Sequence, residues 1–232
     1  MDLGIEGKRA IVCGGSSGLG RAIARALSLE GVDVTIVARD EAKLAATVDA
    51  IQAESGNPVQ GLSVDLAVPT ERTSVTRVCA DVDILINNAG GPPVGDYLSF
   101  TREQWLAALE LNMLAAIELM NASLPGMRDR KFGRIVNVTS HAVKAPIAAL
   151  SLSNGARAGL TGYVGGIAKD VAQDNVTINN LLPGQFETER LKSNHAYFAD
   201  ARGMTFDEIQ VVAKREIPAG RFGNPTEFGA YA

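Results

Sequence analysis

A glycine-rich turn near the N-terminus has the residue types to hold a phosphate group. Gly14, Gly18 and Gly20 lie between an apolar run at 10–13 and an amphipathic helical pattern. A strand that turns through glycines into a helix directs free backbone N–H groups and the positive end of the helix dipole at one point. Glycines also let a pyrophosphate approach the backbone without a Cβ in the way. The turn predicts dinucleotide binding; its other predicted contact residues are Ser16, Ser17 and Leu19.

Two alternatives exist for this turn. A tight turn with a glycine cap is the simpler one, since the spacing is G-x-x-x-G-x-G rather than G-x-G-x-x-G. A P-loop is the other, because Gly15 and Gly20 have the right separation. However, Arg21 and Ala22 stand where a P-loop needs Lys and Ser or Thr to reach phosphate and Mg²⁺. The sequence therefore excludes a P-loop nucleotide triphosphatase.

The end of the second apolar run bears on which dinucleotide binds. An acidic residue there would accept a hydrogen bond from the ribose 2′-OH of NAD, whereas an arginine accommodates the 2′-phosphate of NADP. The run ends in Ala38-Arg39-Asp40, so Arg39 favours NADP(H); the alternative is an exposed arginine that precedes a helix. Asp65, followed by Leu66, ends the third run and is placed to accept from an adenine amino group.

These residues require a frame of parallel strands. Apolar runs predict strands at 10–13, 32–37, 59–65, 84–87, 135–139 and 176–182, with helical patterns between them. Thr101-x-x-Gln104 and Thr205-x-x-Glu208 are typical of capping boxes that open helices. The runs at 84–87 and 135–139 are continuously apolar, as expected when helices cover both faces of a sheet. The pattern predicts an α/β fold: one doubly wound Rossmann-like domain, residues 1–232, with a parallel sheet.

The composition of the chain argues against several classes of protein function. Of 232 residues, 46% are apolar and 21% are charged, which is ordinary for a globular protein. The net charge of −4 gives no basic footprint for nucleic acid, and nothing predicts a metal site. No run of about 18 apolar residues exists to span a membrane, and the N-terminus lacks a signal-peptide pattern. The only two cysteines fit a reducing compartment, so we expect a cytoplasmic protein.

The segment Asn87-Asn88-Ala89-Gly90 follows the fourth apolar run. Together with the glycine turn, it makes the chain resemble the short-chain dehydrogenase/reductase family, and within it the 3-oxoacyl-acyl-carrier-protein reductases. The resemblance covers residues 8–232. It implies that Asn88, Ala89 and Gly90 border the adenosine. It further implies that Asn112 anchors a proton-relay water, that Ser140 hydrogen-bonds the substrate carbonyl, and that the nicotinamide carboxamide is held by Pro183, Gly184 and Thr188.

The catalytic pair departs from this family. In that family a Tyr-x-x-x-Lys motif begins thirteen residues after the serine that matches Ser140. At those positions this chain has Ser153 and, four residues later, Arg157. That spacing puts both side chains on one helix face. Arg157 can hold the nicotinamide ribose but does not relay a proton, and Ser153 is a weaker acid than a phenol. Strand alternation predicts that His141 points away from the site, and Tyr163 lies about 240° around the helix from Arg157.

The resemblance implies an NADP(H)-dependent oxidoreductase that moves a hydride between the cofactor and a carbonyl or alcohol substrate, a small molecule or an acyl-carrier-linked 3-oxoacyl thioester. The alternative is a catalytically silent NADP(H)-binding sensor or partner subunit. Residues 186–217 occupy the place of a substrate lid, which suggests a bulky substrate or a mobile loop. The resemblance also implies a homo-oligomer, a dimer or tetramer. The chain stops at 229–232, inside an expected helix, after which relatives continue for one more strand.

Overall fold

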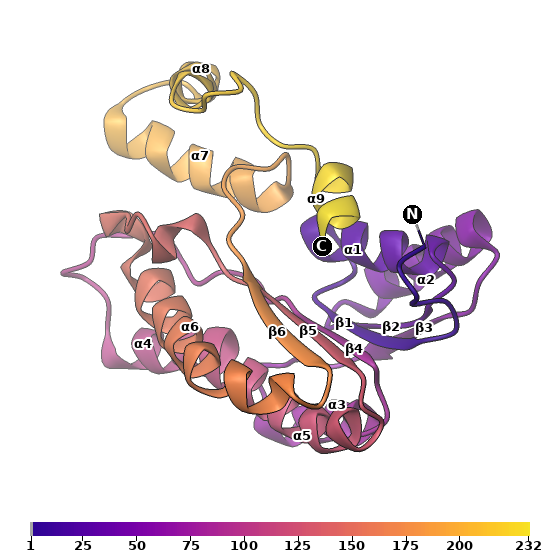
Figure 1. Ribbon diagram of the computed structural model, residues 1–232. Coiled ribbons are helices and arrows are strands. Elements are labelled where there is room, and N and C mark those ends of the chain that lie inside the picture. Colours follow the sequence, from indigo (N-terminus) through magenta and orange to yellow (C-terminus); the bar gives the residue numbers. More distant parts are fainter. Residues whose placement is uncertain (1) are drawn as a thin grey trace.

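The computed structural model describes residues 2–232 and contains one six-stranded parallel sheet of order β3-β2-β1-β4-β5-β6 (Figure 1). This order reverses between β1 and β4, the point at which ligands bind in open α/β sheets. All six strands fall within two residues of their predicted positions. They are β1 (Arg9–Cys13), β2 (Asp33–Ala38), β3 (Val59–Ser63), β4 (Ile84–Asn87), β5 (Gly133–Val138) and β6 (Val176–Leu181).

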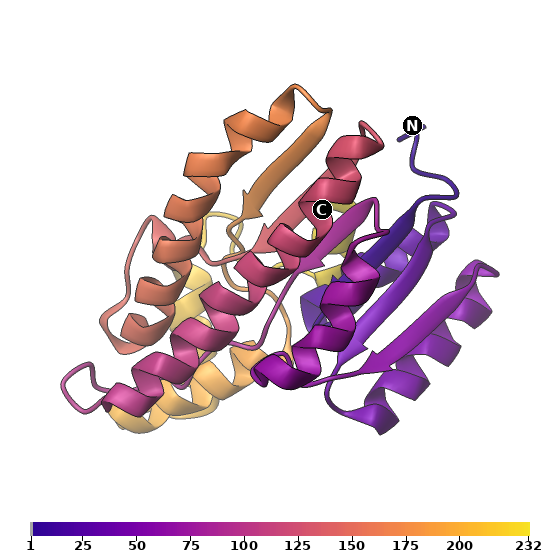
Figure 2. The ribbon, with the colours of Figure 1, turned by 90° about the horizontal axis from the view of Figure 1, so that it is seen from below.

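Helices cover both faces of the sheet because alternate strand residues point to opposite sides. Val12 and Ile86 pack on one side, under α1 (Gly18–Leu29), α2 (Glu41–Ser55) and α9 (Pro225–Tyr231). Ile11 and Leu85 pack on the other, against α3 (Pro69–Cys79), α5 (Ala115–Asp129) and α6 (Ser151–Ala172), as Figure 2 shows from that side. The doubly wound α/β fold that the sequence predicts is confirmed.

A long helical stretch is interrupted in its middle. It begins as α4 (Arg102–Leu109), where Thr101 and Gln104 form the predicted capping box, and it continues as α5. Between them, η1 (Glu110–Leu114) is a π-helical turn. Such wide turns are rare inside α-helices and occur frequently at functional sites. This one places Asn112 against the site described below.

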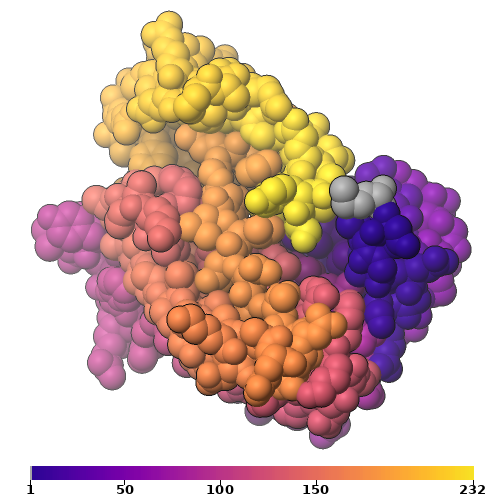
Figure 3. All heavy atoms as spheres, viewed as in Figure 1, coloured from indigo at the N-terminus to yellow at the C-terminus, as the bar shows by residue number. Residues whose placement is uncertain are grey.

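Residues 186–217 stand above the carboxyl ends of the strands (Figures 1 and 3). They contain α7 (Glu189–Arg202) and α8 (Phe206–Arg215), the latter opened by the predicted Thr205–Glu208 capping box. The two helices pack together around His195, whose ring lies 6.3 Å from that of Phe206. None of the helices within residues 2–232 combines the length and the apolar character needed to cross a membrane.

Candidate active site

A cleft of about 1440 Å³ opens at the carboxyl ends of the strands and is closed on one side by α7. Its walls come from the loops after all six strands. The cleft brings together all but one of the predicted site residues: Gly14, Ser16, Ser17, Gly18, Leu19, Arg39, Asp65, Leu66, Asn88, Ala89, Gly90, Asn112, Ser140, Ser153, Arg157, Pro183, Gly184 and Thr188. The exception is Gly20, which does not line the cleft.

The glycine turn leaves the start of α1 open toward the cleft. Gly14 and Gly18 have φ values of +58° and +53°, a region that residues with a side chain rarely adopt. Ser17 precedes the helix without making a side-chain capping hydrogen bond, and the first turn of α1 holds no acidic residue. The N–H groups at this helix end are therefore free to bind an anion.

Gly20 and Gly15 serve packing instead. A Cβ on Gly20 would come within 2.3 Å of the Gly14 carbonyl oxygen, and one on Gly15 within 2.7 Å of Ile36 Cγ2. Asn88 then locks the turn to β4, since its Nδ2 donates to the carbonyl oxygens of Cys13 and Gly14 at 3.3 Å each. Asn88 thus holds the loops after β1 and β4 together, as required where strand order reverses.

Arg39 lies at the end of the cleft where the sequence predicts that the adenosine half of the cofactor binds. Its side chain is 77% exposed, and its nearest carboxylate oxygen is Asp65 Oδ2, at 3.9 Å. Asp65 follows β3 in a turn rather than ending the strand, because its Oδ1 accepts a hydrogen bond from Ala67 N. The predicted strand was therefore two residues too long. Arg39 remains free to bind another anion.

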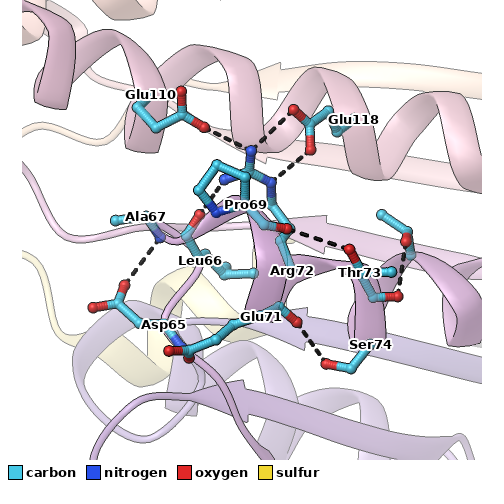
Figure 4. A network of polar contacts seen from close by, with 11 residues as sticks. Asp65, Leu66, Ala67, Pro69, Glu71, Arg72, Thr73, Ser74, Glu110 and Glu118 are labelled. Atoms are coloured by element: carbon cyan, nitrogen blue, oxygen red, sulfur yellow. Dashed lines mark hydrogen bonds and ion pairs between the residues drawn. The ribbon is translucent and has the colours of Figure 1, made fainter.

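A buried arginine joins α3 to the loop after β3 and to the neighbouring helical stretch (Figure 4). Arg72 of α3 is fully buried and donates to Leu66 O, to Glu118 and to Glu110 of η1, the last at 2.6 Å. Burial by itself would lower the pKa of Arg72, but its hydrogen bonds and ion pairs with Glu118 and Glu110 outweigh burial and raise that pKa. Arg72 thereby ties the loop after β3 to the π-helical turn that carries Asn112.

Asn112 is 4% exposed, and neither its Nδ2 nor its Oδ1 has a hydrogen-bond partner within residues 2–232. A buried amide with both atoms unpaired is costly unless a water or a ligand binds it. The side chain lines the cleft, where that partner can enter. The geometry thus fits the water-anchoring role that the resemblance implied.

Ser153 and Arg157 meet on one face of α6, as their spacing predicts. Arg157 Nε donates to Ser153 Oγ at 3.1 Å, Nη1 donates to Val138 O at 2.7 Å, and Nη2 donates to Ala89 O at 3.4 Å. Desolvation by burial, together with the positive charge of Arg190, lowers the pKa of Arg157 to about 10. Arg157 therefore remains a cation at neutral pH.

Ser140 and His141 both line the cleft. β5 ends at Val138, and a 3₁₀ turn begins at His141, with Ser140 Oγ accepting from Ala142 N at 3.1 Å. The prediction that His141 lies outside the site was wrong, because strand alternation does not extend past Val138 and His141 lines the cleft. The His141 backbone N also donates to Pro183 O at 3.0 Å, which joins the loops after β5 and β6.

Sequence reasoning missed Arg190, a cation that lines the cleft. Thr188 caps α7 by accepting from Leu191 N, and its methyl group would lie 3.4 Å from a Cβ on Gly18. Two residues later, Arg190 reaches across to the loop after β4, where Nη2 donates to Pro92 O at 2.6 Å. The contact could not be predicted from the sequence because Pro92 is 98 residues from Arg190 in the chain. The one available signal was that Arg190 lies in the first turn of a helix at the cleft.

This chain is similar in sequence and in fold to known proteins. Residues 8–197 match the family model of the short chain dehydrogenases. The 3-oxoacyl-acyl-carrier-protein reductase of Vibrio cholerae is 31% identical, over 98% of this chain and 89% of that protein. The D-beta-hydroxybutyrate dehydrogenase of Cupriavidus necator is 32% identical, over 98% and 90% respectively. The L-sorbose reductase of Gluconobacter frateurii, solved with NADPH and L-sorbose, superposes with a TM-score of 0.91 at 29% identity, covering 100% of this chain and 90% of that one.

Proposed function

This chain belongs to the short chain dehydrogenase family, and we propose that it is an NADP(H)-dependent oxidoreductase that interconverts a carbonyl and an alcohol with Ser153 and Arg157 as an atypical pair. One observation carries the proposal: the two side chains are hydrogen-bonded to each other in the cleft that Ser140 and Asn112 also line. A chain that had merely lost the usual pair would have no reason to keep these groups joined and buried.

The residues fit the cofactor. The turn around Gly14 and Gly18 presents free N–H groups for the pyrophosphate, and Arg39 is available for the 2′-phosphate. Thr188 adjoins this turn, and Arg157 retains a positive charge for the ribose. When bound, NADPH supplies the hydride, while the protein supplies orientation and manages the proton. Relatives such as the sorbose reductase, solved with NADPH, support this assignment.

The chain's own groups can stabilise charge on a substrate oxygen. Ser153 Oγ accepts from Arg157 Nε, so its own O–H is left to donate to that oxygen. Ser140 offers a second hydroxyl, and the buried guanidinium provides a fixed positive field next to them. Because Arg157 keeps its proton, the proton for the product comes through Ser153 from a water, and the unpaired Asn112 amide is the place to hold one.

The named relatives suggest a 3-oxoacyl thioester or a related 3-oxo compound as the substrate. Residues 186–217 would act as the lid over it, since α7 forms one wall of the cleft. A lid excludes water from the reacting groups and strengthens their electrostatic effect.

The experiment is a steady-state assay of NADPH oxidation with a panel of 3-oxoacyl thioesters and simple ketones. Wild type should turn over part of the panel, and Ser153→Ala should lower kcat about 10²-fold, the lower end of general acid–base effects, with NADPH affinity unchanged. Ser74→Ala is the matched control, because Ser74 is exposed on α3 and does not line the cleft. NADPH binding without any turnover would instead favour a silent cofactor-binding protein.

We also propose that copies of this chain associate. Four large apolar side chains between 97 and 114 are between 40% and 78% exposed, namely Tyr97, Leu98, Leu106 and Leu114. Large apolar side chains that are exposed to this degree are typical of association surfaces. Light scattering behind a size-exclusion column should give a dimer or tetramer mass, and Leu106→Glu should shift it toward the monomer. A monomeric wild type would contradict this.

A further inference from the structure

Two arginines at the catalytic end of the cleft form no ion pair with a carboxylate among the described residues. Arg157 and Arg190 both line the cleft and hydrogen-bond to one loop, at Ala89 O and Pro92 O, three residues apart. Within residues 2–232, neither guanidinium has a carboxylate oxygen within 4.0 Å. Glu189, which also lines the cleft, is paired with Lys192 instead. Two adjacent unpaired cations are unfavourable unless an anion joins them.

Further unpaired polar groups lie beside Arg190 on the same helix. Asn194 is four residues along α7 and so shares its face with Arg190, and it also lines the cleft. Its Oδ1 is buried without a partner among the described residues. His195, 4% exposed, uses Nε2 on Gln185 Oε1 at 3.0 Å and leaves Nδ1 unpaired there as well. The inner face of α7 is thus built for a polar ligand rather than for a plain acyl chain.

The cofactor does not account for Arg190. In the proposed function, the start of α1 binds the pyrophosphate, Arg39 the 2′-phosphate and Arg157 the ribose. Arg190 reaches its loop on the far side of Gly90, and its guanidinium lies over Gly91, where a Cβ would come within 2.8 Å of Nη2. Its remaining N–H groups are therefore left for the substrate.

We infer that the substrate is an oxo acid, whose carboxylate is bound by the Arg190 guanidinium while its carbonyl oxygen lies at Ser140 and Ser153. This inference rests on the proposed function and names its substrate class. A guanidinium suits the role because its planar fork can give two parallel hydrogen bonds to one carboxylate.

The test compares pyruvate, acetoacetate and levulinate with their methyl esters, which keep the carbonyl but lose the charge. Rates are measured with NADPH, and calorimetry measures binding of each compound to the NADP⁺-loaded protein. At least one acid should exceed its ester by about tenfold or more in kcat/KM, the effect expected from charge-assisted hydrogen bonds. Arg190→Gln should remove that preference through KM, and Arg190→Lys should restore part of it. Lys192→Gln, which removes an equal charge from α7 outside the cleft, should behave as wild type.

Every outcome of the comparison between acids and esters either supports the oxo-acid inference or overturns it. Equal or better use of the esters, binding of none of the acids, or an Arg190→Gln effect confined to NADPH affinity would overturn the inference; the last result would make Arg190 a cofactor clamp. If no compound is reduced but an acid binds in an Arg190-dependent manner, the acidic-ligand inference stands while the proposed oxidoreductase function fails.

Discussion

Arg157 Nε and Ser153 Oγ are joined by a 3.1 Å hydrogen bond, and both residues are more than nine-tenths buried. The direction of this bond matters, because the arginine can only donate and the serine must accept. The serine's own proton is consequently left for a third group. In the proposed function, the pair therefore presents the Ser153 hydroxyl as a donor, and Arg157 itself exchanges no proton.

Restoring Tyr-x-x-x-Lys should damage this site. Lysine has one nitrogen in place of the fork that reaches Ser153, Val138 O and Ala89 O together, and tyrosine at 153 needs space that the buried serine does not occupy. Ser153→Tyr with Arg157→Lys should lower kcat on the wild-type substrate by about 10²-fold. Steady-state kinetics beside Ser153→Ala measures this; a faster double variant would show that the native pair is only a weakened form of the usual one.

Arg39 should select the cofactor. A charge-assisted hydrogen bond to the 2′-phosphate is worth about 1.5–3 kcal/mol, or one to two decades in Kd. Calorimetry should therefore find tighter binding of NADPH than of NADH. Arg39→Ala should weaken the binding of NADPH and leave the binding of NADH unchanged. NADH serves as the internal control because it lacks the phosphate. Equal affinities in the wild type would contradict the assignment.

Arg72→Met should destabilise the fold and loosen the adenosine end of the cleft. The change leaves the Leu66 carbonyl and the carboxylates of Glu110 and Glu118 without their donor, at a cost of about 2 kcal/mol. Urea unfolding measures the cost, and fluorescence titration measures NADPH affinity. Arg77→Met, an exposed change on the same helix, should leave both unchanged. Equal effects of the two variants would deny Arg72 its structural role.

Gly20→Ala should disturb folding rather than catalysis alone. The added Cβ meets the Gly14 carbonyl at 2.3 Å, and overpacking of this kind costs about 1–3 kcal/mol. Gly162→Ala, on α6 with no atom within 4 Å of the new Cβ, should be neutral or stabilising because alanine favours helices. Thermal unfolding of the two variants should shift in opposite directions, and a Gly20→Ala variant as stable as wild type would refute the packing argument.

His195 should make the stability of residues 186–217 depend on pH. Burial lowers its pKa below the usual value of about 6.5. The unfolded chain then takes up the proton more readily, so the contribution of neutral His195 is complete above about pH 6.5 and is lost as pH falls toward the folded-state pKa. Between pH 7.5 and 5.5, the Tm of wild type should fall more than that of His195→Phe. Parallel Tm curves for wild type and His195→Phe would contradict the prediction.

The sequence by itself determined the parts of this protein that depend on neighbours along the chain. The glycine turn opens α1, the two threonine capping boxes open α4 and α8, and Ser153 and Arg157 share a helix face. Each follows from the period of a strand or helix or from the φ that a turn requires. The apolar runs likewise located the six strands, and the central β4 and β5 are buried along nearly their whole length because helices cover both faces of the sheet.

Only the tertiary structure decided which distant groups meet at the cleft. The Arg157 acceptors come from the ends of β5 and β4, Arg190 of α7 reaches Pro92, and Arg72 joins Leu66 to the turn that carries Asn112. His141 entered the cleft because β5 ends at Val138, which local alternation does not reveal. These contacts join residues 6 to 98 positions apart, and they depend on how the loops after parallel strands converge, a property of the assembled sheet and not of any one segment.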